Sequence, residues 1–137
     1  LAIPRNTPWE KAYGCERWVF CGCKSPMTRV RALEKQGVKV LRSRSERPDP
    51  REILRSFSAA GVKRLLLEGG GEFNAAFLEQ GLVDTIYLTL VPLVIGGVDA
   101  PTWLEGKGFP KGRFPRFHLA DCQRKGEELY LTYQKTN

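Results

Sequence analysis

The stretch that decides the fold joins an apolar run to three glycines and a helical pattern: Leu65-Leu66-Leu67-Glu68-Gly69-Gly70-Gly71-Glu72-Phe73-Asn74. The near-continuous apolar run predicts a strand over 64–67 that is buried on both faces, as in a parallel sheet. Phe73, Ala76 and Phe77 then follow at helical spacing. We therefore expect a strand, a tight turn and a helix that Gly81 ends.

The glycine turn has the composition of an anion-binding site. Consecutive glycines let the backbone adopt positive φ and approach a ligand closely. The helix that follows points its free N–H groups, and the positive end of its dipole, at the same place. This pattern predicts a phosphate or pyrophosphate site, and the alternative is a turn that binds nothing. The spaced G-x-G-x-x-G fingerprint and the Lys-Ser/Thr ending of a Walker loop are absent, which disfavours the standard dinucleotide domain and the P-loop NTPases.

Upstream of the turn, the sequence predicts two strand-then-helix units. A strand over 18–21 precedes a helix over 27–36, which Ser25 caps, with Pro26 in the first position and Gly37 as the stop. A second strand over 38–41 precedes a charged loop and a helix that starts at Asp49-Pro50-Arg51-Glu52. There Asp caps, Pro takes the first position and Glu reaches back from the third.

Downstream, a strand over 85–91 leads into a loop over 92–115 that is rich in glycine and proline. Strands over 117–122 and 129–134 flank a turn at Lys125-Gly126, which predicts an antiparallel hairpin at the sheet edge. Alternating strands and helices indicate right-handed crossovers. We expect one α/β domain over 1–137, with a mainly parallel twisted sheet flanked by helices and a C-terminal antiparallel hairpin.

The bulk composition excludes several classes of protein. The 137 residues are 42% hydrophobic and 27% charged, with a formal charge of +7. That charge fits either a basic soluble surface or a binding field for an anionic ligand. Nucleic acid is disfavoured because aromatic residues do not alternate with the scattered basic ones. No apolar run approaches the roughly 18 residues of a membrane span. The N-terminus has no signal-peptide pattern, and it lacks an initiator Met, as a fragment or a processed form would.

The cysteines predict neither a disulfide framework nor a metal site. The group Cys15, Cys21 and Cys23 has no paired C-x-x-C spacing and no nearby histidine. We expect no bound metal and reduced thiols in a cytoplasmic protein. His118 itself is expected on the surface of the closing hairpin.

Motifs around and beyond the turn resemble one enzyme family. The run from Glu68 to Asp84 resembles the signature of the riboflavin-pathway reductases, which are the reductase domains of bifunctional deaminase-reductases and their stand-alone relatives. The stretches 86–92, Ile95-Gly96-Gly97 and 126–131 continue the match. Dihydrofolate reductases share the fold and a related glycine turn. The resemblance therefore implies a dihydrofolate-reductase-like fold.

The resemblance also implies an activity. A member would reduce the ribosyl group of 5-amino-6-(5-phosphoribosylamino)uracil to ribityl with hydride from NADPH, and it would be a homodimer. Two alternatives stay open: a dihydrofolate-reductase-like oxidoreductase with another substrate, and a non-enzymatic nucleotide-binding half-domain. The cofactor's own hydride chemistry needs no catalytic triad, and the catalytic residues are not identified.

Carried over by motif position, the resemblance assigns site residues. Glu68 would contact the substrate, and Arg5 would replace a phosphate-binding arginine that is common in the family where Ala2 stands. The Gly69–Gly70 peptide would be cis, as in dihydrofolate reductases. Ser25, beside Lys24, would lie near the cofactor's adenosine side and its 2′-phosphate. The NADPH phosphates would be held by the turn and helix start: Gly69, Gly70, Gly71, Glu72, Phe73, Asn74, Ala75 and Ala76.

The resemblance covers essentially this whole chain but only the later part of the family's domain. The family's first strands and first helix, which supply much of the substrate and nicotinamide pocket, have no counterpart here. The zinc deaminase domain is also absent from the sequence. These gaps leave open whether the chain is a fragment of a longer protein.

Overall fold

The computed structural model describes residues 14–136, which divide into two compact units between Ser56 and Phe57. Each unit has its own sheet, a parallel pair in the first and three antiparallel strands in the second. Arg5 lies outside the described residues. That residues 1–137 act as one domain stays a prediction.

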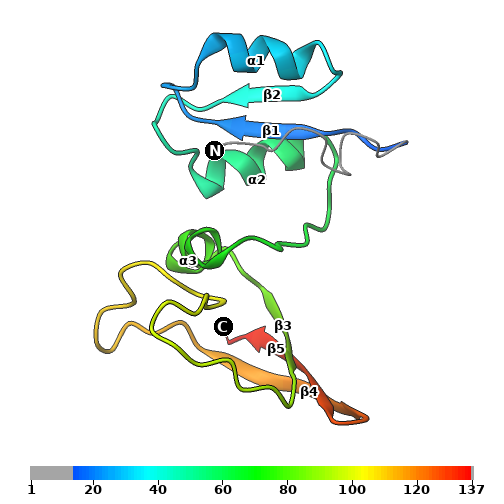
Figure 1. The fold of residues 1–137 in the computed structure, drawn as a ribbon, viewed down its shortest axis with the longest axis vertical. Coiled ribbons are helices and arrows are strands. Elements are labelled where there is room, and N and C mark those ends of the chain that lie inside the picture. Colours follow the sequence, from blue (N-terminus) through cyan, green and yellow to red (C-terminus); the bar gives the residue numbers. More distant parts are fainter. Residues whose placement is uncertain (1–13, 137) are drawn as a thin grey trace. The chain divides into compact units, whose positions relative to one another are not determined.

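The first unit is a parallel strand pair between two helices. Its elements in order are β1 (Trp18–Cys21), α1 (Met27–Glu34), β2 (Lys39–Arg42) and most of α2 (Pro50–Ala59), since the division between the units falls inside this helix. The register pairs Trp18 with Lys39, and α1 is the crossover between the strands. The helices lie on opposite sides of the pair (Figure 1). Val30, Val38 and Ile53 are buried and form the core.

The predicted helix signals of this unit are only partly right. The Asp49 carboxylate accepts a hydrogen bond from the Arg51 N–H at 2.7 Å, so the expected Asp49 cap of α2 is confirmed. The predicted reach-back of Glu52 is wrong, because its carboxylate accepts from the Ser43 hydroxyl instead. The cap of α1 is wrong as predicted, because Pro26 takes the cap position and no side chain bonds the helix start there. The stop is right: Gly37 has φ of 74°, which a residue without a Cβ adopts readily.

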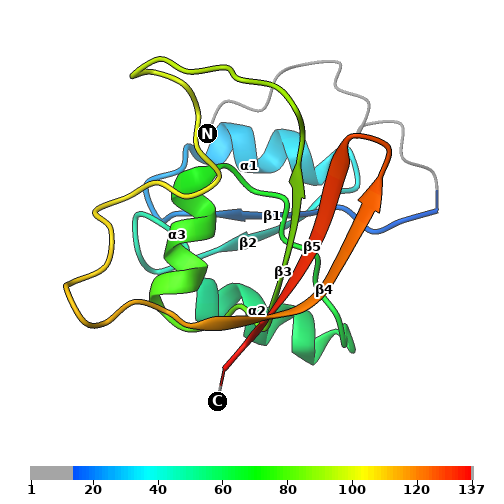
Figure 2. The same cartoon turned by 90° about the horizontal axis from the view of Figure 1, so that it is seen from below.

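The second unit pairs every strand antiparallel. Its elements in order are α3 (Gly71–Glu79), β3 (Thr85–Leu90), β4 (Phe117–Lys125) and β5 (Glu128–Lys135). The strand order is β3-β5-β4, so the last strand in the chain is the central one (Figure 2). The predicted C-terminal hairpin is confirmed, but of its two strands only β4 lies at the sheet edge. β4 carries a bulge between Leu119 and Asp121. Buried Ala75, Phe77 and Leu78 anchor α3.

The predicted buried strand before the glycines is absent. Residues 62–70 form neither helix nor strand, and Leu66 is 69% exposed. A strand needs a neighbour for its main-chain groups, and no strand among residues 14–136 pairs with this segment. The expectation of a mainly parallel sheet is therefore wrong for the described residues, where only β1 and β2 run parallel.

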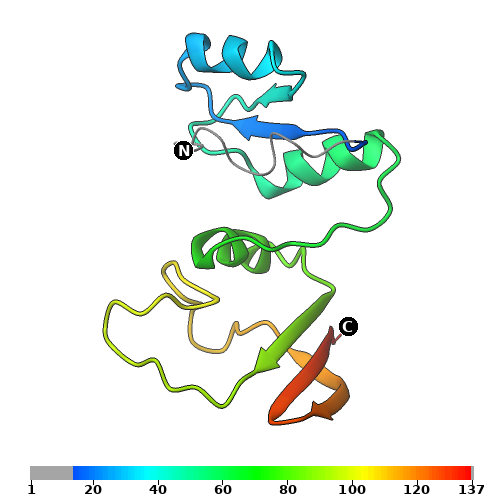
Figure 3. The ribbon, with the colours of Figure 1, turned by 45° about the vertical axis from the view of Figure 1, so that its right-hand side comes forward.

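The glycine- and proline-rich segment between β3 and β4 is a long loop, as predicted. Residues 91–116 contain neither helix nor strand. The loop leaves the sheet and folds back toward α3 before β4 begins (Figure 3). It carries several exposed apolar side chains, with Val94 fully accessible. None of the helices described is both long enough and apolar enough to cross a membrane.

Candidate functional site

The glycine turn ends in a helix start of the predicted kind. Gly70 is the N-cap of α3 in an extended conformation, with φ of −65° and ψ of 169°. Its carbonyl accepts the N–H groups of Phe73 and Asn74, both at 3.0 Å. Helix geometry leaves the Gly71 N–H without an acceptor inside the helix. The positive end of the helix dipole therefore lies at this turn.

The glycines are needed for space and not for positive φ. None of the three has positive φ, and there is no cis peptide bond among residues 14–136, so both of those expectations are wrong. A Cβ on Gly69 would lie 2.4 Å from the Phe73 ring, and one on Gly71 would lie 2.5 Å from the Glu105 side chain. Gly70 has nothing within 4 Å of its Cβ position. Two of the glycines thus make room for the chain itself, and only Gly70 leaves open space.

The long loop holds the start of α3. The Glu105 N–H donates to the Gly71 carbonyl at 3.1 Å. The Asn74 side-chain amide donates to the Trp103 carbonyl at 2.8 Å. The Asn74 Oδ1 is buried and has no hydrogen-bond partner in the described structure. A buried acceptor of this kind normally has a donor, so a water or a ligand donor would complete the site.

The other predicted residues of the turn differ in accessibility. Glu68 and Glu72 are exposed. Phe73 is half-exposed and packs edge-on against Phe77, with ring centroids 5.0 Å apart. Ala75 is buried, so its side chain belongs to the core. The turn fits an anionic group on two observations: the open space at Gly70 and the helix start. The orphan oxygen of Asn74 requires a donor instead, such as a water or a hydroxyl of the ligand.

Ser25 lies in the other unit, after β1. The loops that follow β1 and β2 are bonded to each other, since the Cys23 N–H donates to the Ser45 carbonyl at 2.8 Å. The Lys24 ammonium pairs with the Glu46 carboxylate. Lys24 therefore already has an acidic partner at the place where the sequence predicted a phosphate.

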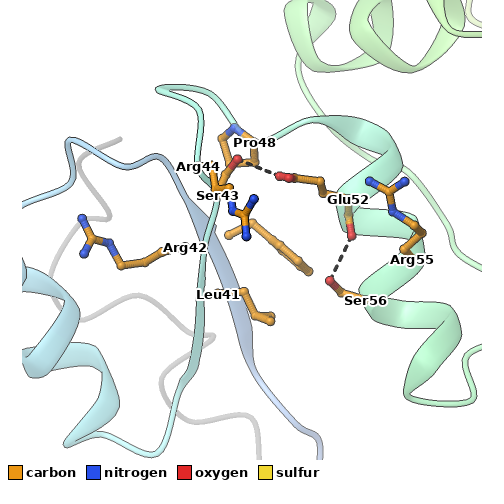
Figure 4. A pocket seen from close by; sticks show the side chains of 9 residues that line it. Leu41, Arg42, Ser43, Arg44, Pro48, Glu52, Arg55 and Ser56 are labelled. Atoms are coloured by element: carbon orange, nitrogen blue, oxygen red, sulfur yellow. Dashed lines mark hydrogen bonds between the residues drawn. The ribbon is translucent and has the colours of Figure 1, made fainter.

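This unit also contains a hollow that was not predicted from the sequence. It has a volume of about 410 Å³ and lies at the carboxyl end of β2 against α2 (Figure 4). Its lining residues are Phe20, Leu41, Arg42, Ser43, Arg44, Pro48, Glu52, Arg55 and Ser56. The available signal was an arginine-rich loop directly after a parallel strand, because ligands bind beyond the carboxyl ends of such strands.

Comparison with known proteins assigns the chain to a family. Residues 9–131 match the family described as the RibD C-terminal domain. The chain belongs to the RibD C-terminal domain family. That match covers the glycine turn, the long loop and most of the terminal hairpin. The family is the reductase family of riboflavin biosynthesis, so the predicted resemblance is confirmed.

Individual relatives agree with the RibD assignment. The chain is 33% identical over 110 residues to a 2,5-diamino-6-ribosylamino-4(3H)-pyrimidinone 5′-phosphate reductase of Methanothermobacter thermautotrophicus, covering 80% of this chain and 50% of that protein. It is 26% identical over 133 residues to riboflavin biosynthesis protein RibD of Bacillus amyloliquefaciens, covering 96% of this chain and 36% of that protein. The chain thus spans half or less of the length of these curated relatives.

Solved structures give the same fold. A pyrimidine reductase-like protein from Corynebacterium diphtheriae aligns with a TM-score of 0.76 at 20% identity, over 88% of this chain and 50% of that one. RibD of Acinetobacter baumannii aligns with a TM-score of 0.69 at 20% identity, over 99% of this chain and 42% of that one. This RibD-type chain therefore has the α/β, dihydrofolate-reductase-like fold of the family.

The histidine and the cysteines of this RibD-type chain are the remaining residues that the sequence singled out. His118 is exposed on β4, opposite Gln134, as the sequence predicted. None of the four cysteines forms a disulfide bond within residues 14–136. No group of three or more potential metal ligands occurs within residues 14–136.

Proposed function

We propose that this chain is the nucleotide-binding part of an NADPH-dependent reductase that converts the ribosyl group of 5-amino-6-(5-phosphoribosylamino)uracil to ribityl. The observation that carries the proposal is the turn at Gly70, which is open to solvent and backed by the start of α3. Family membership supports the reaction class. Bound NADPH would supply the hydride, and the second hydrogen would be taken up as a proton.

In this proposal the chain's own residues bind and orient. Main-chain atoms at Gly70 and Gly71 hold the negatively charged pyrophosphate, because a helix start offers N–H donors and a positive dipole end. The orphan Oδ1 of Asn74 accepts a hydrogen bond from the ligand or its water. Exposed Glu68 contacts the substrate. Roles for Arg5 and Ser25, and a cytoplasmic homodimer, remain part of the proposal.

The test is a titration of the full chain with NADPH, followed over a graded series of substitutions at Gly70. A Cβ at Gly70 meets nothing of the chain, so Gly70→Ala and Gly70→Val should fold normally by circular dichroism. Gly70→Val should abolish NADPH binding because its methyl groups fill the space of the phosphates, and Gly70→Ala should weaken it. Unchanged NADPH affinity in folded Gly70→Val would refute the site.

A second candidate is a nucleotide-binding half-domain without turnover. The helix start at Gly70 suits this candidate as well as the reductase, because binding a nucleotide there requires no turnover. Following NADPH oxidation with the phosphoribosylaminouracil present separates the two functions. Oxidation coupled to ribityl product supports the reductase, whereas tight NADPH binding without product supports the half-domain.

A further inference from the structure

We propose that the hollow between β2 and α2 is a second anion site, which binds the phosphate monoester of a nucleotide through Arg44 and Arg55. Every lining residue belongs to the first unit. The volume of about 410 Å³ falls within the range of roughly 300–1,000 Å³ that is usual for small-molecule pockets. The site deepens the proposed function and rests on it for its two candidate ligands.

The three arginines of the hollow are not equivalent. The Arg42 guanidinium bonds the Cys23 and Ser25 carbonyls and points away from the hollow (Figure 4). Arg44 and Arg55 come from the loop after β2 and from α2, on opposite sides of the hollow. Neither guanidinium has an acidic or carbonyl partner among residues 14–136. A guanidinium binds phosphate oxygens with paired N–H donors, so these two cations are available for a shared anion.

One acidic side chain, Glu52, also lines the hollow. Its Oε2 accepts a hydrogen bond from the Ser43 hydroxyl at 2.7 Å, which fixes the carboxylate on the α2 side. The negative charge of Glu52 opposes an anion, and the two facing arginines outweigh it by one unit of charge. Removing the Glu52 charge should therefore strengthen anion binding. A hollow that binds no anion would not respond in this way.

The rest of the lining suits a nucleotide better than a bare ion. Phe20, Leu41 and Pro48 supply apolar surface beside the arginines. Apolar walls with a few charged groups are typical of sites for ligands that carry both a ring and a polar head. Two such ligands belong to the proposed function: the 2′-phosphorylated adenosine of NADPH and the 5′-phosphorylated ribose of the substrate.

The experiment measures the affinity of the full chain for NADPH, NADH and ribose 5-phosphate by calorimetry, in wild type and in the Arg44→Ala, Arg55→Ala double variant. We expect about a tenfold loss per arginine, the low end for a hydrogen bond to a charged group. Arg29→Ala is the matched control, because Arg29 is an exposed arginine on α1 outside the hollow. Glu52→Gln keeps the side-chain shape and should raise affinity several-fold.

The three ligands distinguish the two phosphates that the hollow could bind. Loss of NADPH affinity with NADH affinity unchanged assigns the site to the 2′-phosphate, and loss of ribose 5-phosphate binding assigns it to the substrate. Wild-type affinities for all three ligands in the double variant would overturn the inference, as would no binding of any of them to wild type. Arginine-dependent binding of ribose 5-phosphate without NADPH binding would sink the proposed function and leave this site standing.

Discussion

At the scale of single residues, Gly22 is the described glycine whose Cβ position has the least space. It is buried between β1 and α1, and a Cβ there would lie 1.7 Å from the Glu46 carbonyl oxygen. That oxygen is main chain, so the two bonded loops would have to separate. Gly22→Ala should destabilise the protein by about 1–3 kcal/mol, the usual cost of overpacking.

The control for Gly22→Ala is Gly70→Ala. Gly70 has an ordinary φ, and its Cβ position is open, so alanine should leave stability unchanged or raise it by about 0.4–1 kcal/mol. Thermal unfolding followed by circular dichroism compares the two variants. Equal melting temperatures would contradict the close approach at Gly22.

Tyr130 carries a titration prediction. Its hydroxyl donates to the Glu128 carboxylate at 2.6 Å. That hydrogen bond and then the carboxylate charge, with a smaller contribution from burial, raise the pKa of Tyr130 above 10.0. A raised pKa in the folded state means that the interaction stabilises the protein below pH 10 and is lost as the pH rises through the raised value.

Tyrosinate absorbance against pH measures the Tyr130 shift. The difference between wild type and Tyr130→Phe isolates this residue from the other tyrosines. Glu128→Gln should bring the midpoint of Tyr130 back toward 10. A midpoint that Glu128→Gln does not change would show that the pair does not persist in solution.

At the scale of elements, β5 supports the second unit from its centre. Leu131 pairs with Leu88 on one side and Cys122 on the other. Proline cannot donate to a ladder and is tolerated only at edges and bulges. Leu131→Pro should therefore abolish the antiparallel sheet, whereas Ala120→Pro, at the bulge of edge strand β4, should be tolerated. Amide hydrogen exchange across β3 would report both outcomes, and protection retained in Leu131→Pro would contradict the strand order.

Elements were predictable from the sequence where the signal is local. The Asp49 cap and the Gly37 stop use only neighbouring backbone, and both are present. A strand over 64–67 needs a neighbouring strand to pair with, and the described residues do not supply one. The apolar run alone was therefore not sufficient to predict a strand. The same holds for the site. The helix start at Gly70 was predictable, but the return of Glu105 to Gly71 joins residues distant in the sequence. The hollow beside Arg44 is mostly local, and its only signal was the arginine-rich loop after β2.

At the scale of the whole molecule, the formal charge of +7 should act on ligand binding. Salt screens exposed charges over about 10 Å at 0.1 M. The affinity for NADPH should therefore fall as sodium chloride rises, and more steeply than that for NADH, which lacks the 2′-phosphate. Calorimetry at low and high salt measures both slopes. Equal salt dependence of the NADPH and NADH affinities would show that no basic site binds the extra phosphate.

Self-association is the second prediction for the whole chain. β3 and β4 each have one outer edge without a partner strand in the described residues, and such edges tend to pair with another chain. We expect a homodimer through one of them. A monomer by light scattering at micromolar concentration would count against it.

The position of β5 in the strand order also constrains how the protein is made. Both of its neighbours, β3 and β4, are synthesised before it. β3 therefore has no β5 to pair with while the ribosome translates the long loop and β4. The nascent chain must carry β3 with its main-chain groups unpaired until the final strand emerges. During that interval Ile86 and Leu88, which are half-buried in the folded unit, are open to chaperones and to other unfinished copies.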